Sequence, residues 1–239
     1  MRVERCFAFV DLCGFTAFTE RYGDEYTVVV LASFRTTLRE VAARRGVRIT
    51  KWLGDGAMLS SPDTEPTVAM VLEIAAHADT MLVLPYPSPV LSAGADGSSE
   101  DRLAIRAGLA RGPVIMFEGD DYIGSATNIA SRLCDAATPG QVLATREVAA
   151  LAPRWVAASE AFPYPVRGFN KPIEAVRLAA GSSATMVVDP TCGLALPQVS
   201  GLITRSRADR TVEYFCSTAC AIGWEQAQRA AVIGFPFPD

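Results

Sequence analysis

The chain has 239 residues, 50% of them hydrophobic and 20% charged, and its formal net charge is −4. This composition predicts a packed globular protein with one medium domain and a smaller additional part. The small net charge argues against binding to nucleic acid or to a membrane surface through bulk electrostatics. There is no signal-peptide pattern and no apolar run of transmembrane length, so a cytoplasmic protein is expected.

In chain order, the hydrophobic pattern first predicts a strand at 3–12 and a helix at about 24–45. A strand hairpin follows at 47–61, and a second helix is predicted at about 66–82. Residues 85–101 are rich in Pro, Gly and Ser, so we interpret them as a loop insertion.

Strands dominate the pattern that follows the insertion. The stretch 103–119 alternates like a strand, and its Arg111–Pro113 segment predicts a turn before the strand resumes. A helix is predicted at 125–137, then a short strand and a helix start at 141–151, and a hairpin at 164–180. This order predicts an α+β fold with an antiparallel sheet and with helices on one face.

Two aspartates occupy notable positions in this pattern. Asp11 ends the apolar run CFAFVDLCGFT, and Asp55 lies between two glycines in the hairpin RITKWLGDGAML. Each position alone is typical of a cap or turn residue. If the two strands pair, however, the carboxylates lie at neighbouring strand ends, where their repulsion favours a bound cation. An oxygen-preferring ion such as Mg²⁺, shared with substrate phosphates, suits such a pair.

Other polar side chains occur in segments that are otherwise apolar. Lys51 precedes Asp55 by about 13 Å of extended chain, which is too far for a direct ion pair. Asn128 and Arg132 are four residues apart and share one face of the predicted helix, and Asp121 precedes that helix. An ordinary polar helix face is the alternative interpretation of this last group.

The only histidine and three of the six cysteines lie in sequence contexts that do not suggest a functional site. His77 lies far from these motifs, so a single chain offers no multi-histidine metal site and no catalytic Ser-His-Asp triad. Cys6, Cys13 and Cys134 occur in apolar or helical contexts that are typical of small buried side chains.

The other three cysteines, Cys192, Cys216 and Cys220, lie in the last part of the chain, 186–239, after a linker at 181–185. Cys216 and Cys220 are spaced so that both point one way from the start of a helix. In a cytoplasmic protein a bound metal is favoured over disulfides, and three reduced structural cysteines are the alternative.

Three separated segments resemble the signature segments of the class III nucleotide cyclases, namely FAFVDLCGFTAFTE, KWLGDGAML and GDDYIGSATNIASRL. The hairpin RGFNKPIEAVRL is similar to the last hairpin of that catalytic domain, so the resemblance covers roughly residues 3–178. It implies a catalytic domain at 1–180 with a ferredoxin-like antiparallel sheet and helices.

The resemblance also implies an activity, which is the conversion of ATP to 3′,5′-cyclic AMP and pyrophosphate by an adenylate cyclase. It implies that Asp11 and Asp55 bind two divalent cations, Mg²⁺ or Mn²⁺, and that Lys51 and Asp121 recognise adenine. A guanylate cyclase, which the Lys51 and Asp121 pair disfavours, is one alternative. A non-catalytic protein that senses nucleotides or metals is another.

The remaining implied roles concern the transition state and the dimer. Asn128 and Arg132 match the residues that stabilise the transition state in this family. The resemblance implies a homodimer with two interface active sites, where one chain supplies the aspartates and the other supplies the remaining residues. Trp52 is bulkier than the family pattern at its position.

The segments DPTCGLAL and VEYFCSTACAIGW resemble a YHS or TRASH-type metal-binding module at 186–239. This second resemblance implies that the three cysteines there bind Zn²⁺ or a softer ion such as Cu(I), and that the module regulates the enzyme. Asp189 is a weak candidate for a fourth ligand.

Overall fold

The computed structural model describes residues 1–78, 103–117, 121–207 and 209–232. The predicted loop at 85–101 and the predicted end of the helix at 66–82 lie outside these residues. The chain forms two compact units, which consist of 1–152 with 158–178 and of 153–157 with 179–239.

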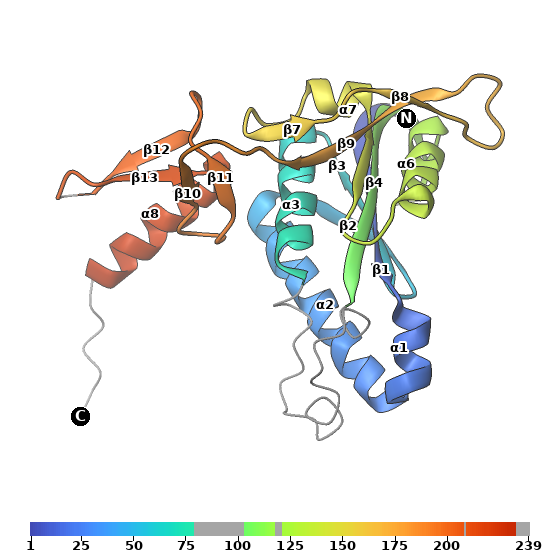
Figure 1. Ribbon diagram of the computed structural model, residues 1–239, viewed down its shortest axis with the longest axis horizontal. Helices are drawn as coiled ribbons and strands as arrows, with labels where there is room; N and C mark the ends of the chain where they lie inside the picture. Colours follow the sequence, from blue (N-terminus) through green and yellow to red (C-terminus); the bar gives the residue numbers. More distant parts are fainter. Residues whose placement is uncertain (79–102, 118–120, 208, 233–239) are drawn as a thin grey trace. The chain divides into compact units, whose positions relative to one another are not determined.

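The sheet of the first unit is built around β1 (Arg2–Cys13), as Figure 1 shows. β1 pairs antiparallel with β3 (Gly56–Ser61) on one side and with β4 (Ala104–Phe117) on the other. β2 (Arg48–Leu53) pairs with the outer side of β3, so the predicted hairpin at 47–61 is confirmed. The resulting order β2-β3-β1-β4 is that of a ferredoxin-like sheet, which confirms the predicted fold class.

Three helices make the connections in this part of the sheet. α2 (Asp24–Arg45) matches the predicted helix, and α3 (Thr64–Ala76) connects β3 to β4. A further helix, α1 (Phe15–Tyr22), lies between β1 and α2, where we predicted none. It is short and begins after Gly14, whose φ of 80° turns the chain sharply out of the strand.

Helices cover both faces of the sheet, so the expectation of helices on one face is wrong. α2 and α3 lie on one side, whereas α6 (Ser125–Ala136) lies on the other (Figure 1). Phe7 of β1 packs with Ala126 and Ala130 of α6, while the neighbouring Cys6 hydrogen-bonds to threonines of α3. Consecutive buried residues in β1 require cover on both faces, because successive side chains of a strand point to opposite sides.

The predicted turn at Arg111–Pro113 is also wrong, because β4 runs through it without a break. Pairing with β1 along the whole segment outweighs the local turn preference of Gly-Pro. On its other edge β4 pairs through Ala107–Leu109 and again through Ile115–Phe117. Pro113 lies between these two stretches, where its missing N–H disturbs no ladder.

The remaining elements of the first unit extend the sheet. β5 (Asp121–Ile123) pairs with the end of β4, and β6 (Val142–Thr145) runs parallel to β4. The predicted last hairpin is present as β8 (Phe162–Tyr164) and β9 (Ile173–Ala180). Between β6 and β8 come α7 (Arg146–Ala150), in the first unit, and β7 (Val156–Ala158), most of which is assigned to the second unit.

The second unit is small and contains two strand pairs and one helix. They are β10 (Met186–Val188) with β11 (Ala195–Pro197), β12 (Ile203–Ser206) with β13 (Val212–Phe215), and α8 (Thr218–Val232). Buried Trp155 belongs to this unit, and its indole Nε1 donates to the carbonyl oxygen of Cys216 at 2.8 Å. None of the helices in the described residues combines the length and apolar character needed to cross a bilayer.

Gly108 of β4 lies directly under α6, and a side chain there should be strongly destabilising. A Cβ atom at this position would overlap the backbone of Ala130 and Cys134 and lie 2.7 Å from the carbonyl carbon of Leu133. We therefore expect Gly108→Ala to lower the free energy of unfolding by about 3 kcal/mol or more, measured by urea denaturation.

Gly112→Ala in the same strand is the matched control. Its Cβ would lie 3.3 Å from the methyl group of Ala126, which can adjust, so a loss below about 1 kcal/mol is expected. Equal losses for the two variants would show that α6 does not pack on β4 as described.

Candidate functional site

The register of β1 brings Asp11 and Asp55 to the same end of the sheet. Asp11 pairs with Gly56 of β3, and Asp55 is the residue just before Gly56 in the hairpin turn. A Cβ atom at position 56 would lie 2.7 Å from the carbonyl oxygen of Val10 and 3.1 Å from Oδ1 of Asp11. Glycine is therefore needed where the turn approaches the aspartate.

The environment of Asp55 changes the ionisation of its carboxyl group. Burial raises the pKa of Asp55 above its ordinary value, and the negative charge of Asp11 raises it further. Its own backbone N–H and Arg106 oppose this shift. A divalent cation would remove the repulsion, and carboxylate oxygens are the ligands that Mg²⁺ and Mn²⁺ prefer. The two side chains therefore fit such ions.

Arg106 is a member of this site that the sequence patterns did not indicate. It lies opposite Asp11 in β4, and its Nε and Nη2 atoms donate to Oδ2 of Asp11 at 2.9 and 2.6 Å. Its Nη1 also donates to the carbonyl oxygen of Asp135 at the end of α6, at 3.3 Å. An arginine within an apolar strand was the available signal, but its partner depends on a register that the sequence does not reveal.

The hairpin turn that carries Asp55 is held from α2. Arg35 donates from Nη2 to the carbonyl oxygen of Gly54 at 2.9 Å. The guanidinium groups of Arg35 and Arg39 lie 5.0 and 5.1 Å from the centre of the Trp52 ring. The unusually bulky Trp52 thus serves as the surface on which these two arginines stack.

Lys51, in the first strand of the hairpin, forms an ion pair with Asp121 of β5. Both side chains are about half exposed, at 47% and 48%, so the pair can open toward a ligand. The strand β2 ends at Leu53, and Asp55 lies in the turn beyond it. Lys51 and Asp55 therefore have different partners, as their separation along the sequence predicted.

Lys51 and Asp121 line a hollow of about 270 Å³ together with Asn128 of α6. Its other lining residues are mainly apolar or small: Phe9, Leu53, Met58, Tyr122, Thr127 and Ser131. Neither Asp11 nor Asp55 lines it. A polar pair beside apolar walls is suited to a flat heterocycle with hydrogen-bonding groups on its edge.

Arg132 lies one helical turn beyond Asn128 but does not line the hollow. Its Nη1 atom is 3.2 Å from Oδ2 of Asp135, and its side chain is 53% exposed. The predicted site residues of one protomer thus form two groups, the aspartate pair and the hollow, with Arg132 outside both.

The three cysteines of the second unit lie together, as free thiols. The sulfur of Cys216 is 3.7 Å from that of Cys192 and 3.6 Å from that of Cys220. With a carboxylate oxygen of Asp189, these atoms all lie within 4.8 Å of one another. Hydrogen bonds with Cys216 and Cys220, and burial, raise the pKa of Cys192, so a metal ion would have to displace its proton. The donor set fits a thiophilic ion.

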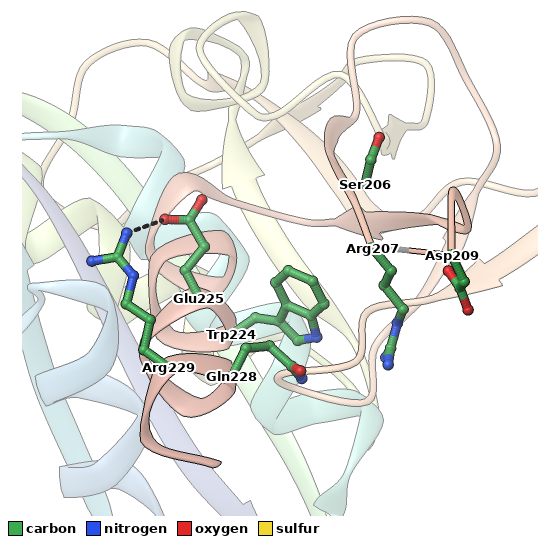
Figure 2. Close-up of a pocket in the computed structure, with 7 residues that line it drawn as sticks. All are labelled: Ser206, Arg207, Asp209, Trp224, Glu225, Gln228 and Arg229. Atoms are coloured by element: carbon green, nitrogen blue, oxygen red, sulfur yellow. Dashed lines mark ion pairs between the residues drawn. The ribbon is translucent and has the colours of Figure 1, made fainter. Parts of the chain in front are cut away.

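A second hollow, of about 510 Å³, lies on the second unit, and Figure 2 shows the Trp224 ring among its lining side chains. The lining side chains include two arginines and two carboxylates, and Asp209 accepts a hydrogen bond from the backbone N–H of Thr211. Arg229 lies 3.8 Å from Glu225, and Arg207 lies 2.5 Å from Glu213. Since none of the three thiols lines it and its charges balance, we assign no chemistry to it.

Comparisons with known proteins agree with the motifs. Residues 3–178 match the family model described as the adenylate and guanylate cyclase catalytic domain. An uncharacterized protein of Mycobacterium tuberculosis is 31% identical over 170 residues, which is 71% of this chain and 40% of the relative. A pH-sensitive adenylate cyclase of Mycobacterium tuberculosis is 30% identical over 186 residues, or 74% of this chain and 41% of that protein. The chain thus spans about two fifths of these relatives' length.

Solved structures show the same fold. The adenylyl cyclase CyaB from P. aeruginosa superposes with a TM-score of 0.63 at 24% identity, over 77% of this chain and 98% of that chain. Structures of guanylyl cyclases also share the fold.

The raised pKa of Asp55 predicts a pH-dependent effect of its charge on stability. A carboxyl whose pKa is higher in the folded protein contributes stability below its unfolded pKa and loses it as the pH rises through the folded pKa. At pH 7 without divalent ions the ionised group is therefore a cost. We expect Asp55→Asn to melt at a higher temperature than wild type at pH 7, in the presence of a chelator.

The same comparison below about pH 4 is the control, because both proteins are then neutral at this position and the gain should vanish. A variant that melts lower than wild type at pH 7 would contradict the described environment of Asp55.

Proposed function

Since the chain belongs to the adenylate and guanylate cyclase catalytic domain family, we propose that it is an adenylate cyclase, which converts ATP to 3′,5′-cyclic AMP and pyrophosphate. The observation that carries this proposal is the Lys51–Asp121 pair in the hollow beside Asn128. The fold alone is compatible with either purine nucleotide, because solved guanylyl cyclases share it.

The pair favours adenine because of the groups on the edge of that base. Adenine offers an amino donor at N6 and an acceptor at N1. The Asp121 carboxylate can accept from N6, and the Lys51 ammonium can donate to N1. Guanine presents an acceptor at O6 and a donor at N1, so it would leave both side chains opposite groups of the wrong kind. Such mismatches give strong discrimination when they are buried by substrate.

The proposed reaction is an in-line displacement within one ATP molecule. The ribose 3′-oxygen forms a bond to the α-phosphorus, the bond from that phosphorus to the pyrophosphate oxygen breaks, and the 3′-hydroxyl proton is released. Asp11 and Asp55 would hold two divalent cations, whose charge would lower the hydroxyl pKa and bind the triphosphate. Arg132 places positive charge near the α-phosphoryl group in the transition state, and Asn128 orients the ribose.

We further propose that the active protein is a homodimer with two equivalent interface sites. In one protomer the aspartate pair lies outside the hollow. Arg132 lies outside the hollow too, and its ion pair is with Asp135. A two-fold dimer allows Asp11 and Asp55 of one protomer to act on the nucleotide whose base is held by the partner. Each protomer would then contribute half of each site.

For the rest of the chain, we propose a catalytic domain at 1–180, a linker at 181–185 and a metal-binding module at 186–239. The cluster of Cys192, Cys216 and Cys220 supports the module, because thiolates select Zn²⁺ and softer ions. Occupancy of this cluster would regulate the cyclase.

The direct test is nucleotide turnover by the purified 239-residue chain. With Mn²⁺ or Mg²⁺ we expect cyclic AMP from ATP at a higher kcat/KM than cyclic GMP from GTP. Asp55→Ala should lower turnover by roughly 100-fold or more, because it removes a ligand of the divalent ions. Asp24→Ala, at an exposed aspartate in the first turn of α2, is the control and should leave turnover unchanged. ATP binding without any product would contradict the enzyme proposal.

Base selectivity has a separate test in a double substitution. Lys51→Glu together with Asp121→Cys replaces the donor and the acceptor that face adenine. We expect the ratio of kcat/KM for GTP to that for ATP to rise by about 10-fold or more. An unchanged ratio would mean that other residues recognise the base.

A further inference from the structure

Asp189 is fully buried and lies between the two segments that carry the thiols. Its Oδ1 atom accepts hydrogen bonds from the backbone N–H groups of Thr191 at 2.8 Å and Cys192 at 3.3 Å. Its Oδ2 atom accepts from the backbone N–H of Cys216 at 2.8 Å. One carboxylate therefore joins the turn that carries Cys192 to the chain that enters α8.

These bonds fix the carboxylate in place. Three of the roughly four lone-pair positions of the carboxylate are used by backbone N–H groups, so a metal ion would have to share Oδ2 with the N–H of Cys216. Turning the carboxylate toward the ion would leave a buried N–H group without its acceptor, which is costly. The backbone of Asp189 is also tied down, because its N–H donates to Leu194 at 3.0 Å and its carbonyl oxygen accepts from Gly193 at 2.8 Å. Asp189 thus has the contacts of a structural anchor.

The backbone of Cys216 and of Cys220 is held by further hydrogen bonds. The carbonyl oxygen of Cys216 accepts from Trp155, and that of Cys220 accepts from the Thr191 hydroxyl at 2.8 Å. The N–H of Cys220 donates to the Ser217 hydroxyl at 3.2 Å. Each of these bonds uses a backbone atom of Cys216 or Cys220, which leaves both sulfur atoms available, and the Cys216 sulfur lies close to those of Cys192 and Cys220.

We propose that Asp189 is a positioning residue and that the ion of this module is bound by three thiolates, from Cys192, Cys216 and Cys220, without a protein oxygen ligand. This inference rests on the metal-binding module proposed above. Three soft ligands suit a thiophilic ion that accepts three-coordination, such as Cu(I), whereas Zn²⁺ would complete its tetrahedron with an external ligand such as water. Asp189 acts through the backbone by holding two of the three cysteines.

X-ray absorption spectroscopy of the unsubstituted 239-residue chain, loaded with one equivalent of Cu(I), tests the ligand set directly. The proposal predicts three sulfur neighbours around copper and no oxygen neighbour. An oxygen in the coordination shell, or failure to retain copper, overturns it. Neither outcome depends on cyclic AMP formation, so failure here is distinguishable from failure of the proposed enzymatic function.

Asp189→Asn tests the positioning role. Its amide can keep one acceptor but would place an N–H group toward the backbone N–H of Cys216. We expect Co²⁺ to bind with roughly 10- to 100-fold lower affinity, as for other groups that orient metal ligands. At saturation the thiolate-to-cobalt absorption should equal that of wild type. Cys216→Ser should instead lose about a third of this absorption, because it removes one of three thiolates.

Asp209→Asn is the matched control, because Asp209 also accepts a backbone N–H bond, from Thr211 at 2.9 Å, but lies outside the cluster. It should change neither affinity nor absorption. Wild-type affinity in Asp189→Asn, or a shifted ligand-field spectrum at saturation, would contradict the positioning role.

Discussion

The antiparallel pairing of β1 with both β3 and β4 determines where the candidate catalytic side chains meet. Its register places Asp11 opposite Gly56 on one side and opposite Arg106 on the other. A slip of one residue would turn the Asp11 side chain to the other face of the sheet and away from both neighbours. The aspartate pair, the arginine that holds it and the close approach of the hairpin turn all depend on this register.

The hairpin next to β1 then carries one residue of the aspartate pair and one residue of the hollow at different points along its length. Its turn carries Asp55 to the aspartate pair, and its first strand carries Lys51 to Asp121. α6 lies on the face of the sheet where Gly108 allows close contact, and it brings Asn128 to the same hollow as Lys51. A charge pair and a base-sized hollow are therefore built on one rigid scaffold but at different places, which favours a site shared between two protomers.

Local patterns in the sequence predicted the hairpin, α2 and α6, because their hydrophobic spacing and turn residues are encoded within each segment. The motifs also singled out the side chains that the structure brings into the aspartate pair and the hollow, whose roles stay predictions. Features that depend on partners distant in sequence were missed or wrong. β4 stays extended through Pro113 only because β1 pairs with it, and the role of Arg106 follows from its place opposite Asp11. Asp189 likewise became interpretable only when its backbone partners were known.

The central claim is that the aspartates of one protomer act on the nucleotide held by its partner. Mixing Asp55→Ala chains with Arg132→Ala chains tests it, because each variant alone has two defective sites. Random reassociation gives about half mixed dimers, each with one intact site, so cyclic AMP formation should recover to about a quarter of the wild-type rate. A mixture no more active than the two separate variants would contradict the shared site.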